Sequence, residues 1–112
     1  MNFDWAKEVP YAVTICDPIG IIIDMNDRSA LTFETDGGRK LIGTNLLDCH
    51  PEPARSKVVE LLREQKSNTY TIEKKGVKKI IVQTPWFENG KFGGLVELSI
   101  VLPGNMPHFI RG

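Results

Sequence analysis

The C-terminal third of the chain, residues 69–101, reads as three antiparallel strands in succession. The first β-rich run ends at Lys75-Gly76, and the second, residues 77–86, is followed by Asn89-Gly90. Asn-Gly suits the two left-handed positions of a type I′ turn, which is the strongest short-range signal for a β-hairpin. A third run of matching length completes the pattern. Because such a meander leaves an apolar face to be buried, we expect the rest of the chain to cover it.

The size and charge of the chain limit the classes of protein it can belong to. Its 112 residues suit one domain with one modest core. Lys plus Arg and Asp plus Glu both number 14, so the formal net charge is zero and predicts neither a nucleic-acid partner nor a membrane surface. No signal-peptide pattern opens the chain, and Cys16 and Cys49 form no disulfide framework. We therefore expect a reduced, cytoplasmic setting.

A second hairpin is predicted near the N-terminus, from residues 11–16 and 21–25. The tetrapeptide Asp17-Pro18-Ile19-Gly20 joins these runs, with Asp, Pro and Gly at the positions that a type I turn prefers. Asn26 or Asp27 can then cap a short helix over residues 28–33.

The strongest helical pattern lies between the two groups of strands. Ala54, Val58, Leu61, Leu62 and Gln65 follow helical spacing and form one mostly apolar stripe, and Pro53 suits the first turn. This helix crosses from the first hairpin to the meander and can cover the sheet. The chain is therefore predicted to be an α+β domain with an antiparallel sheet and its helices gathered on one face.

The order of these motifs resembles that of a PAS domain, a small sensory module of signalling proteins. The resemblance covers roughly residues 10–102, and its motifs are Asp17-Pro18-Ile19-Gly20, Asp24-Met25-Asn26, the segment 41–46, His50-Pro51 and the segment 88–94. It implies a five-stranded sheet of order 2-1-5-4-3, with helices enclosing a pocket against one face. It also implies a role in sensing or dimerisation. Outside the resemblance we expect an N-terminal helical cap at 1–9 and a tail at 103–112, and the lack of a catalytic constellation predicts a non-catalytic protein.

The resemblance also bears on cofactors. Flavin-binding PAS domains carry a reactive cysteine just after a Gly-x-Asn start, but Gly43-Thr44-Asn45 is followed here by Leu46, which disfavours flavin. His50 could ligate a haem iron or another metal, or it could simply hydrogen-bond the loop backbone. Cys49 beside it could be a redox-responsive thiol or the nucleophile of a small enzyme, with an ordinary loop cysteine as the alternative.

The pocket walls are predicted from the alternation of residues along the strands and the helix. If the Val96 face of the last strand looks inward, it meets the apolar stripe of the long helix. The alternative is a solid core with no cavity. The predicted pocket residues are Val58, Leu61, Leu62, Val82, Trp86, Val96, Leu98 and Ile100.

Both ends of the chain are unusually apolar. Phe3 and Trp5 lie in the N-terminal stretch, and Met106 and Phe109 lie in the tail. These side chains either pack on their own domain or contact a second copy, so we treat them as candidate dimer contacts. The sequence therefore predicts a PAS-type sensory module that acts through a small ligand, through a homodimer or signalling partner, or through both.

Overall fold

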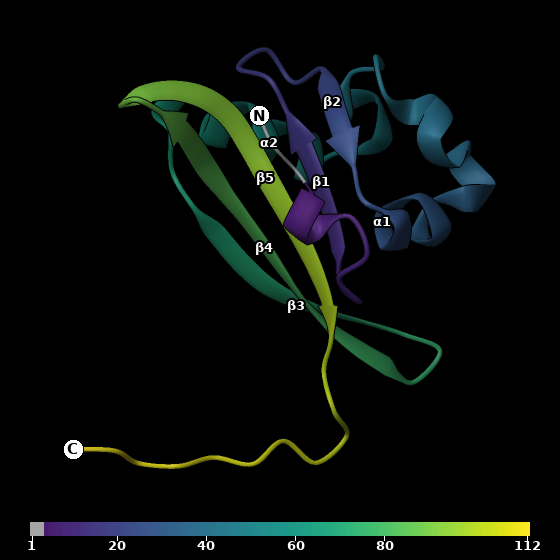
Figure 1. The fold of residues 1–112 in the computed structure, drawn as a ribbon, viewed down its shortest axis with the longest axis vertical. Helices are drawn as coiled ribbons and strands as arrows, with labels where there is room; N and C mark the ends of the chain where they lie inside the picture. The colour runs from purple at the N-terminus through teal and green to yellow at the C-terminus, as the bar shows by residue number, and fades with distance from the viewer. Residues whose placement is uncertain (1–3) are drawn as a thin grey trace.

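The computed structural model describes residues 4–112, in which one sheet is flanked by helices (Figure 1). The 3₁₀ helices are short, and α2 is the longest helix of the described residues. The elements are η1 (Asp4–Ala6), β1 (Ala12–Cys16), β2 (Ile22–Met25), α1 (Asp27–Thr32), η2 (Glu34–Asp36), η3 (Gly38–Leu41), η4 (Leu46–Cys49), α2 (Ala54–Glu64), β3 (Asn68–Lys74), β4 (Val77–Glu88) and β5 (Lys91–Val101).

The sheet has five strands in the order β2-β1-β5-β4-β3, and every neighbouring pair is antiparallel. Both the predicted meander and the predicted N-terminal hairpin are present. The hairpin joins the meander because β1 pairs with β5, so the first and last strands of the chain lie side by side in the middle of the sheet (Figure 1). The strand order and the α+β fold class predicted from the sequence are confirmed.

The turn residues explain why the hairpins form where they do. Asn89 and Gly90 have φ of 52° and 80°, which confirms the left-handed pair that a type I′ turn requires. In the first hairpin the Gly20 amide donates to the Asp17 carbonyl at 3.0 Å, and an Asp17 carboxylate oxygen accepts from the Ile21 amide at 2.9 Å. Side-chain and backbone bonds thus hold this loop in a single conformation.

The core lies between the sheet and the helices. On α2 the predicted stripe places Val58 and Leu61 in the core and Leu62 against it, while Ala54 and Gln65 at its two ends are exposed. The chain leaves the helix at Gln65, which adopts the left-handed conformation. The buried cluster consists of Cys16, Ile22, Met25, Leu46, Val58, Leu61 and Leu95.

The expectation that the Val96 face of the last strand looks inward is wrong. Leu95 belongs to the buried cluster and Glu97 lines the cavity described below, so the odd-numbered residues of β5 face the helices. Alternation along a strand then places Val96 and its even-numbered neighbours on the opposite face. Gln83 on β4 pairs with Glu97, so the odd-numbered residues around Gln83 also face the helices and Val82 faces the other side. The predicted pocket residues Val82, Val96, Leu98 and Ile100 therefore lie half-buried on the far side of the sheet.

The first described element, η1, lies against the domain, whereas the C-terminal tail extends away from it (Figure 1). η1 is tied to the domain because Ala6 is fully buried, yet the neighbouring Trp5 side chain is 79% exposed. The tail after β5 runs away from the domain as an extended segment, with Phe109 69% exposed. Phe3 lies outside the described residues. In the described part of the chain, no helix has the length and apolar character needed to cross a membrane.

Candidate functional site

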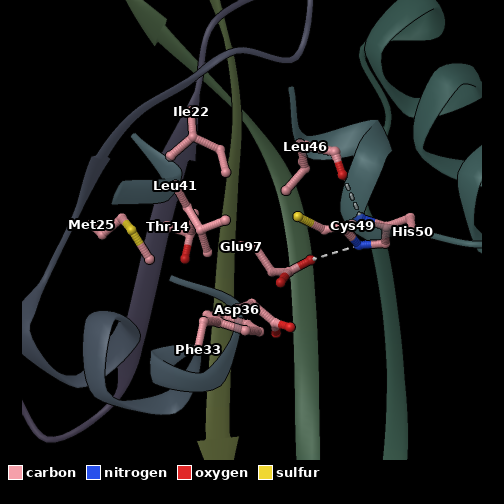
Figure 2. A pocket seen from close by; sticks show the side chains of 10 residues that line it. All are labelled: Thr14, Ile22, Met25, Phe33, Asp36, Leu41, Leu46, Cys49, His50 and Glu97. Atoms are coloured by element: carbon pink, nitrogen blue, oxygen red, sulfur yellow. Dashed lines mark hydrogen bonds and ion pairs between the residues drawn. The ribbon is translucent and has the colours of Figure 1, made fainter. Parts of the chain in front are cut away.

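A cavity of about 110 Å³ lies between the inner face of the sheet and the segment that runs from α1 to η4 (Figure 2). It is partly open to solvent. One side of its wall is apolar, and the other carries two carboxylates and an imidazole. The lining residues are Thr14, Ile22, Met25, Phe33, Asp36, Leu41, Leu46, Cys49, His50 and Glu97.

His50 is positioned by the short helix η4 that precedes it. The Asn45 side chain caps η4 by accepting a hydrogen bond from the Leu47 amide at 2.9 Å. The His50 Nδ1 atom then lies 2.8 Å from the Leu46 carbonyl oxygen. Since a carbonyl only accepts, Nδ1 must carry a proton, and this leaves Nε2 as the nitrogen that faces the cavity.

A polar chain crosses the sheet and ends at this imidazole. The Asn68 amide on β3 donates to the Gln83 side-chain oxygen on β4 at 3.2 Å. Gln83 in turn donates to Glu97 Oε2 on β5 at 2.8 Å, and the same oxygen lies 3.8 Å from His50 Nε2. That last distance is too long for a hydrogen bond and describes an ion pair. These hydrogen bonds from Asn68 and Gln83 hold the Glu97 carboxylate beside the cavity.

The contacts of His50 favour its charged form. The Glu97 carboxylate raises the pKa of His50, burial works in the opposite direction, and the bond to the Leu46 carbonyl raises it further. The net shift is upward because a neutral ring would present the Nε2 lone pair to a carboxylate, whereas an imidazolium presents a proton. The side chains of His50 and Glu97 are only 16% and 14% exposed, so solvent screens this pair weakly.

The Thr14 hydroxyl of the wall is satisfied within the protein. The Thr14 and Ser29 hydroxyls form a buried hydrogen bond of 2.5 Å, which joins β1 to α1. Met25 lines the cavity just before Asn26, whose buried amide caps α1 through the Ser29 amide at 2.9 Å. The wall formed by β1, β2 and α1 is therefore rigidly connected.

Cys49 does not have the surroundings of an activated thiol. Partial burial raises its pKa, and the carboxylates of Asp36 and Asp48 raise it further. A reactive cysteine needs the opposite shift, which a nearby cation or the start of a regular helix provides. The environment of Cys49 therefore supports an ordinary loop cysteine over a redox-responsive or nucleophilic one.

The cavity does not fit haem or another metal centre. At about 110 Å³ it is smaller than the roughly 300–1,000 Å³ that cofactor pockets occupy. The one ring nitrogen available for ligation, His50 Nε2, faces the Glu97 carboxylate. Within residues 4–112, no group of three or more His, Cys, Asp or Glu side chains is arranged to hold a metal ion.

The structure distributes the predicted pocket and ligand residues among four places. His50 and Cys49 both line the cavity, while Val58, Leu61 and Leu62 belong to the core or pack against it. The indole of Trp86 lies against Gly93 and donates to the Cys16 carbonyl at 3.1 Å, away from the cavity. Four strand residues lie on the opposite face: Val82, Val96, Leu98 and Ile100.

Sequence reasoning missed most of the residues that line the cavity. Leu41 and Leu46 lie inside the motif at 41–46, where Leu46 was considered only as the residue that takes the place of a flavin-binding cysteine. Glu97 carried a usable signal, because it is an acidic residue between two apolar neighbours, Val96 and Leu98. The other missed residues are Thr14, Ile22, Met25, Phe33 and Asp36.

The structure is similar to solved structures of PAS domains. The PAS domain of BvgS from Bordetella pertussis aligns with 89% of this chain and 82% of its own, with 16% identity and a TM-score of 0.67. That of nitrogen regulation protein NR(II) from Vibrio parahaemolyticus aligns over 91% and 100%, with 15% identity and a TM-score of 0.61. The Aer2 receptor from Vibrio cholerae, described as a dual PAS-heme oxygen sensor, aligns over 83% and 95%, with 15% identity and a TM-score of 0.63.

These similarities concern the three-dimensional structure. No protein-family model matches the sequence, and no curated protein matches it either. At identities of 15–16%, the likeness establishes a shared fold and leaves the ligand and the partner to be argued from the site itself.

Proposed function

We propose that this chain, which has the PAS fold, is a non-catalytic sensory module of a cytoplasmic signalling system. In this proposal residues 10–102 form the sensory domain, residues 1–9 its N-terminal cap and residues 103–112 its tail. The domain binds a small ligand in the cavity beside His50 and Glu97, and it passes the signal on as a homodimer or to a partner protein.

The observation that carries the proposal is the composition of the cavity wall. Ligand sites are concave and mostly apolar, with a few polar groups that fix the orientation of the ligand. Here the apolar side includes Ile22, Met25 and Phe33, and the polar side is held in place by the chain that ends at Glu97 and His50. The volume of about 110 Å³ limits the ligand to a small molecule.

A non-catalytic role is supported by the state of the two residues that an enzyme would use. The pKa of the Cys49 thiol is raised, so little of it is the nucleophilic thiolate at neutral pH. His50 is engaged by the Leu46 carbonyl and by Glu97. The haem alternative, which the Aer2 similarity raises, finds no support because the cavity is too small for a macrocycle.

Homodimerisation is supported by the apolar side chains that the domain leaves uncovered. Trp5 is 79% exposed, and in the tail Met106 and Phe109 are 57% and 69% exposed. The half-buried aliphatic face of β4 and β5 lies on the side of the sheet away from the cavity. Together these side chains provide a surface on which a second copy can bury apolar area.

Native mass spectrometry of the protein purified from cells tests the proposal. We expect a dimer that carries an additional small component, and denaturing conditions should release that component. A monomer, at a protein concentration that saturates ordinary homodimers, would refute the homodimer, and the absence of any added mass would refute a ligand that stays bound through purification.

A matched pair of variants separates the cavity from the dimer. Leu41→Trp places a larger side chain at the cavity wall and should abolish the added mass while the dimer persists. Leu31→Trp makes the same substitution on the 58%-exposed surface of α1, outside the cavity, and should retain both. If Leu41→Trp keeps the component, the ligand lies elsewhere on the protein.

A further inference from the structure

We infer that the ligand of this cavity is a small organic cation, with a compact hydrocarbon body and a protonated nitrogen that the Glu97 carboxylate binds. This inference rests on the proposed ligand-binding function and names the chemical class of the ligand. Three features of the cavity support it: an oxygen of Glu97 without a hydrogen-bond donor, the excess of negative charge on the wall, and the size of the apolar side.

Glu97 presents an unused hydrogen-bond acceptor to the cavity. Its Oε2 atom accepts from Gln83 and pairs with His50, whereas no described residue donates to Oε1. Among the described residues no fully buried side-chain oxygen or nitrogen lacks a partner, so Oε1 is not a fully buried atom, and the Glu97 side chain lines the cavity. A carboxylate only accepts hydrogen bonds, so a ligand group that binds to Oε1 must be a hydrogen-bond donor.

The charges around the cavity select a positively charged donor. Asp36 supplies a second carboxylate to the wall (Figure 2). Even when His50 is protonated, the wall therefore carries two negative charges and one positive charge. Among residues 4–112, no lysine or arginine lines the cavity, and the nearby Arg39 pairs with Asp27. A ligand carboxylate would meet repulsion here, whereas an ammonium group gains a charge-assisted hydrogen bond.

The apolar side of the cavity sets the size of the ligand body. An engineered apolar cavity of about 150 Å³ accommodates benzene. At about 110 Å³, the present cavity suits a branched aliphatic group that contacts Ile22, Met25 and Phe33. Isobutylamine, isobutanol and isobutyrate are matched probes, because they share this body and differ in charge and donor capacity.

Methyl NMR on methionine-labelled protein provides a direct test. The chain has three methionines, Met1, Met25 and Met106, of which Met25 lines the cavity and Met106 is 57% exposed in the tail. Titration with isobutylamine or isobutanol at neutral pH should shift the Met25 methyl signal and leave Met106 unmoved. For isobutylamine we expect a Kd on the order of 1 mM, about tenfold below that of isobutanol, and no saturable shift with isobutyrate.

Variants assign the preference to the carboxylate. Glu97→Gln keeps the shape of the side chain and an oxygen that Gln83 can bond, and it should reduce the amine preference to near unity. Glu88→Gln removes the same charge at an exposed position near the β4–β5 turn and should retain the preference. Asp36→Asn, also at an exposed position, should lower the preference about threefold and serves if Glu97→Gln fails to fold.

The possible results separate the two proposals. If isobutanol or isobutyrate binds as tightly as the amine, the inferred ligand class is wrong and the cavity remains a ligand site. An amine preference that survives in Glu97→Gln also overturns the assignment. If none of the three probes moves Met25 in the folded protein, both the ligand class and the proposed binding function fail.

Discussion

Replacing Asn26 with alanine should destabilise the protein by more than the loss of an ordinary helix cap. Asn26 is fully buried, and its amide joins three segments. Its Oδ1 atom accepts from the amides of Val13 and Ser29, both at 2.9 Å. Its Nδ2 atom donates to the carbonyls of Ala6 at 3.0 Å and Tyr11 at 2.7 Å. One side chain therefore ties η1 and β1 to the start of α1.

The size of the effect follows from the partners that Asn26→Ala would leave behind. Two buried amides, of Val13 and Ser29, would lose their acceptor, and each unsatisfied donor costs about 1–3 kcal/mol. A water molecule that enters the vacated space recovers part of this. We expect the free energy of unfolding to fall by about 2–5 kcal/mol, a large part of the roughly 5–15 kcal/mol typical of a domain.

Urea unfolding followed by far-UV circular dichroism measures this loss. Asn45→Ala is the matched control, since Asn45 caps η4 through the Leu47 amide but is only half-buried. The control should lose about 1 kcal/mol, the usual value for a cap. If Asn26→Ala loses no more than Asn45→Ala at an unchanged m-value, the account of Asn26 as the junction of three segments is refuted.

Three further predictions concern the site and its surroundings. His50→Gln should lower the free energy of unfolding most below the ordinary histidine pKa of about 6.5, and the loss should shrink as the pH rises above that value. The reason is that the contacts which raise the pKa of His50 stabilise the fold only while the ring is protonated. A loss independent of pH in urea unfolding would contradict this. Trp86→Phe should lower the unfolding free energy by about 1 kcal/mol through loss of the bond to the Cys16 carbonyl, and an unchanged urea midpoint would exclude that contribution. In the folded protein a thiol reagent at neutral pH should modify the exposed Cys49 slowly and Cys16 far more slowly, since burial raises the pKa of Cys16 to about 11. Mass spectrometry measures the two rates, and equal rates would show that Cys16 is accessible.

Local chemistry explains why the fold could be predicted from the sequence. Asn89-Gly90 and Asp17-Pro18-Ile19-Gly20 specify their turns through backbone preferences that depend little on the rest of the protein. The capping residue Asn26 and the stripe that contains Val58 and Leu61 set the helices in the same way. With the hairpins and helices placed in order along the chain, the PAS resemblance supplied the strand order that local signals do not encode.

The cavity could not be predicted in the same way, because it is made by residues that are distant in sequence. Thr14, Phe33 and Glu97 meet only after β1 pairs with β5 and the loop segment folds over the sheet. The polar chain from Asn68 to Glu97 likewise depends on the register of three strands. The spacing of residues within one segment does not indicate which distant residues will be neighbours in the fold. The sequence therefore pointed to His50 and Cys49 but not to the other residues that line the cavity with them.

The error about the inner face of β5 has a physical cause that also bears on function. By alternation alone, Val96 and Leu98 mark the buried face of the strand, while Leu95 and Glu97 form a mixed one. In the folded protein the mixed face is covered by helices, and Glu97 is kept there by Gln83 and His50. Burying a carboxylate is costly unless it is paired, and a purely structural core would use an apolar residue at this position. The carboxylate of Glu97 on the covered face of β5 therefore supports the proposed ligand site, and the half-buried aliphatic residues on the other face of the strand are the ones that the proposed partner would contact.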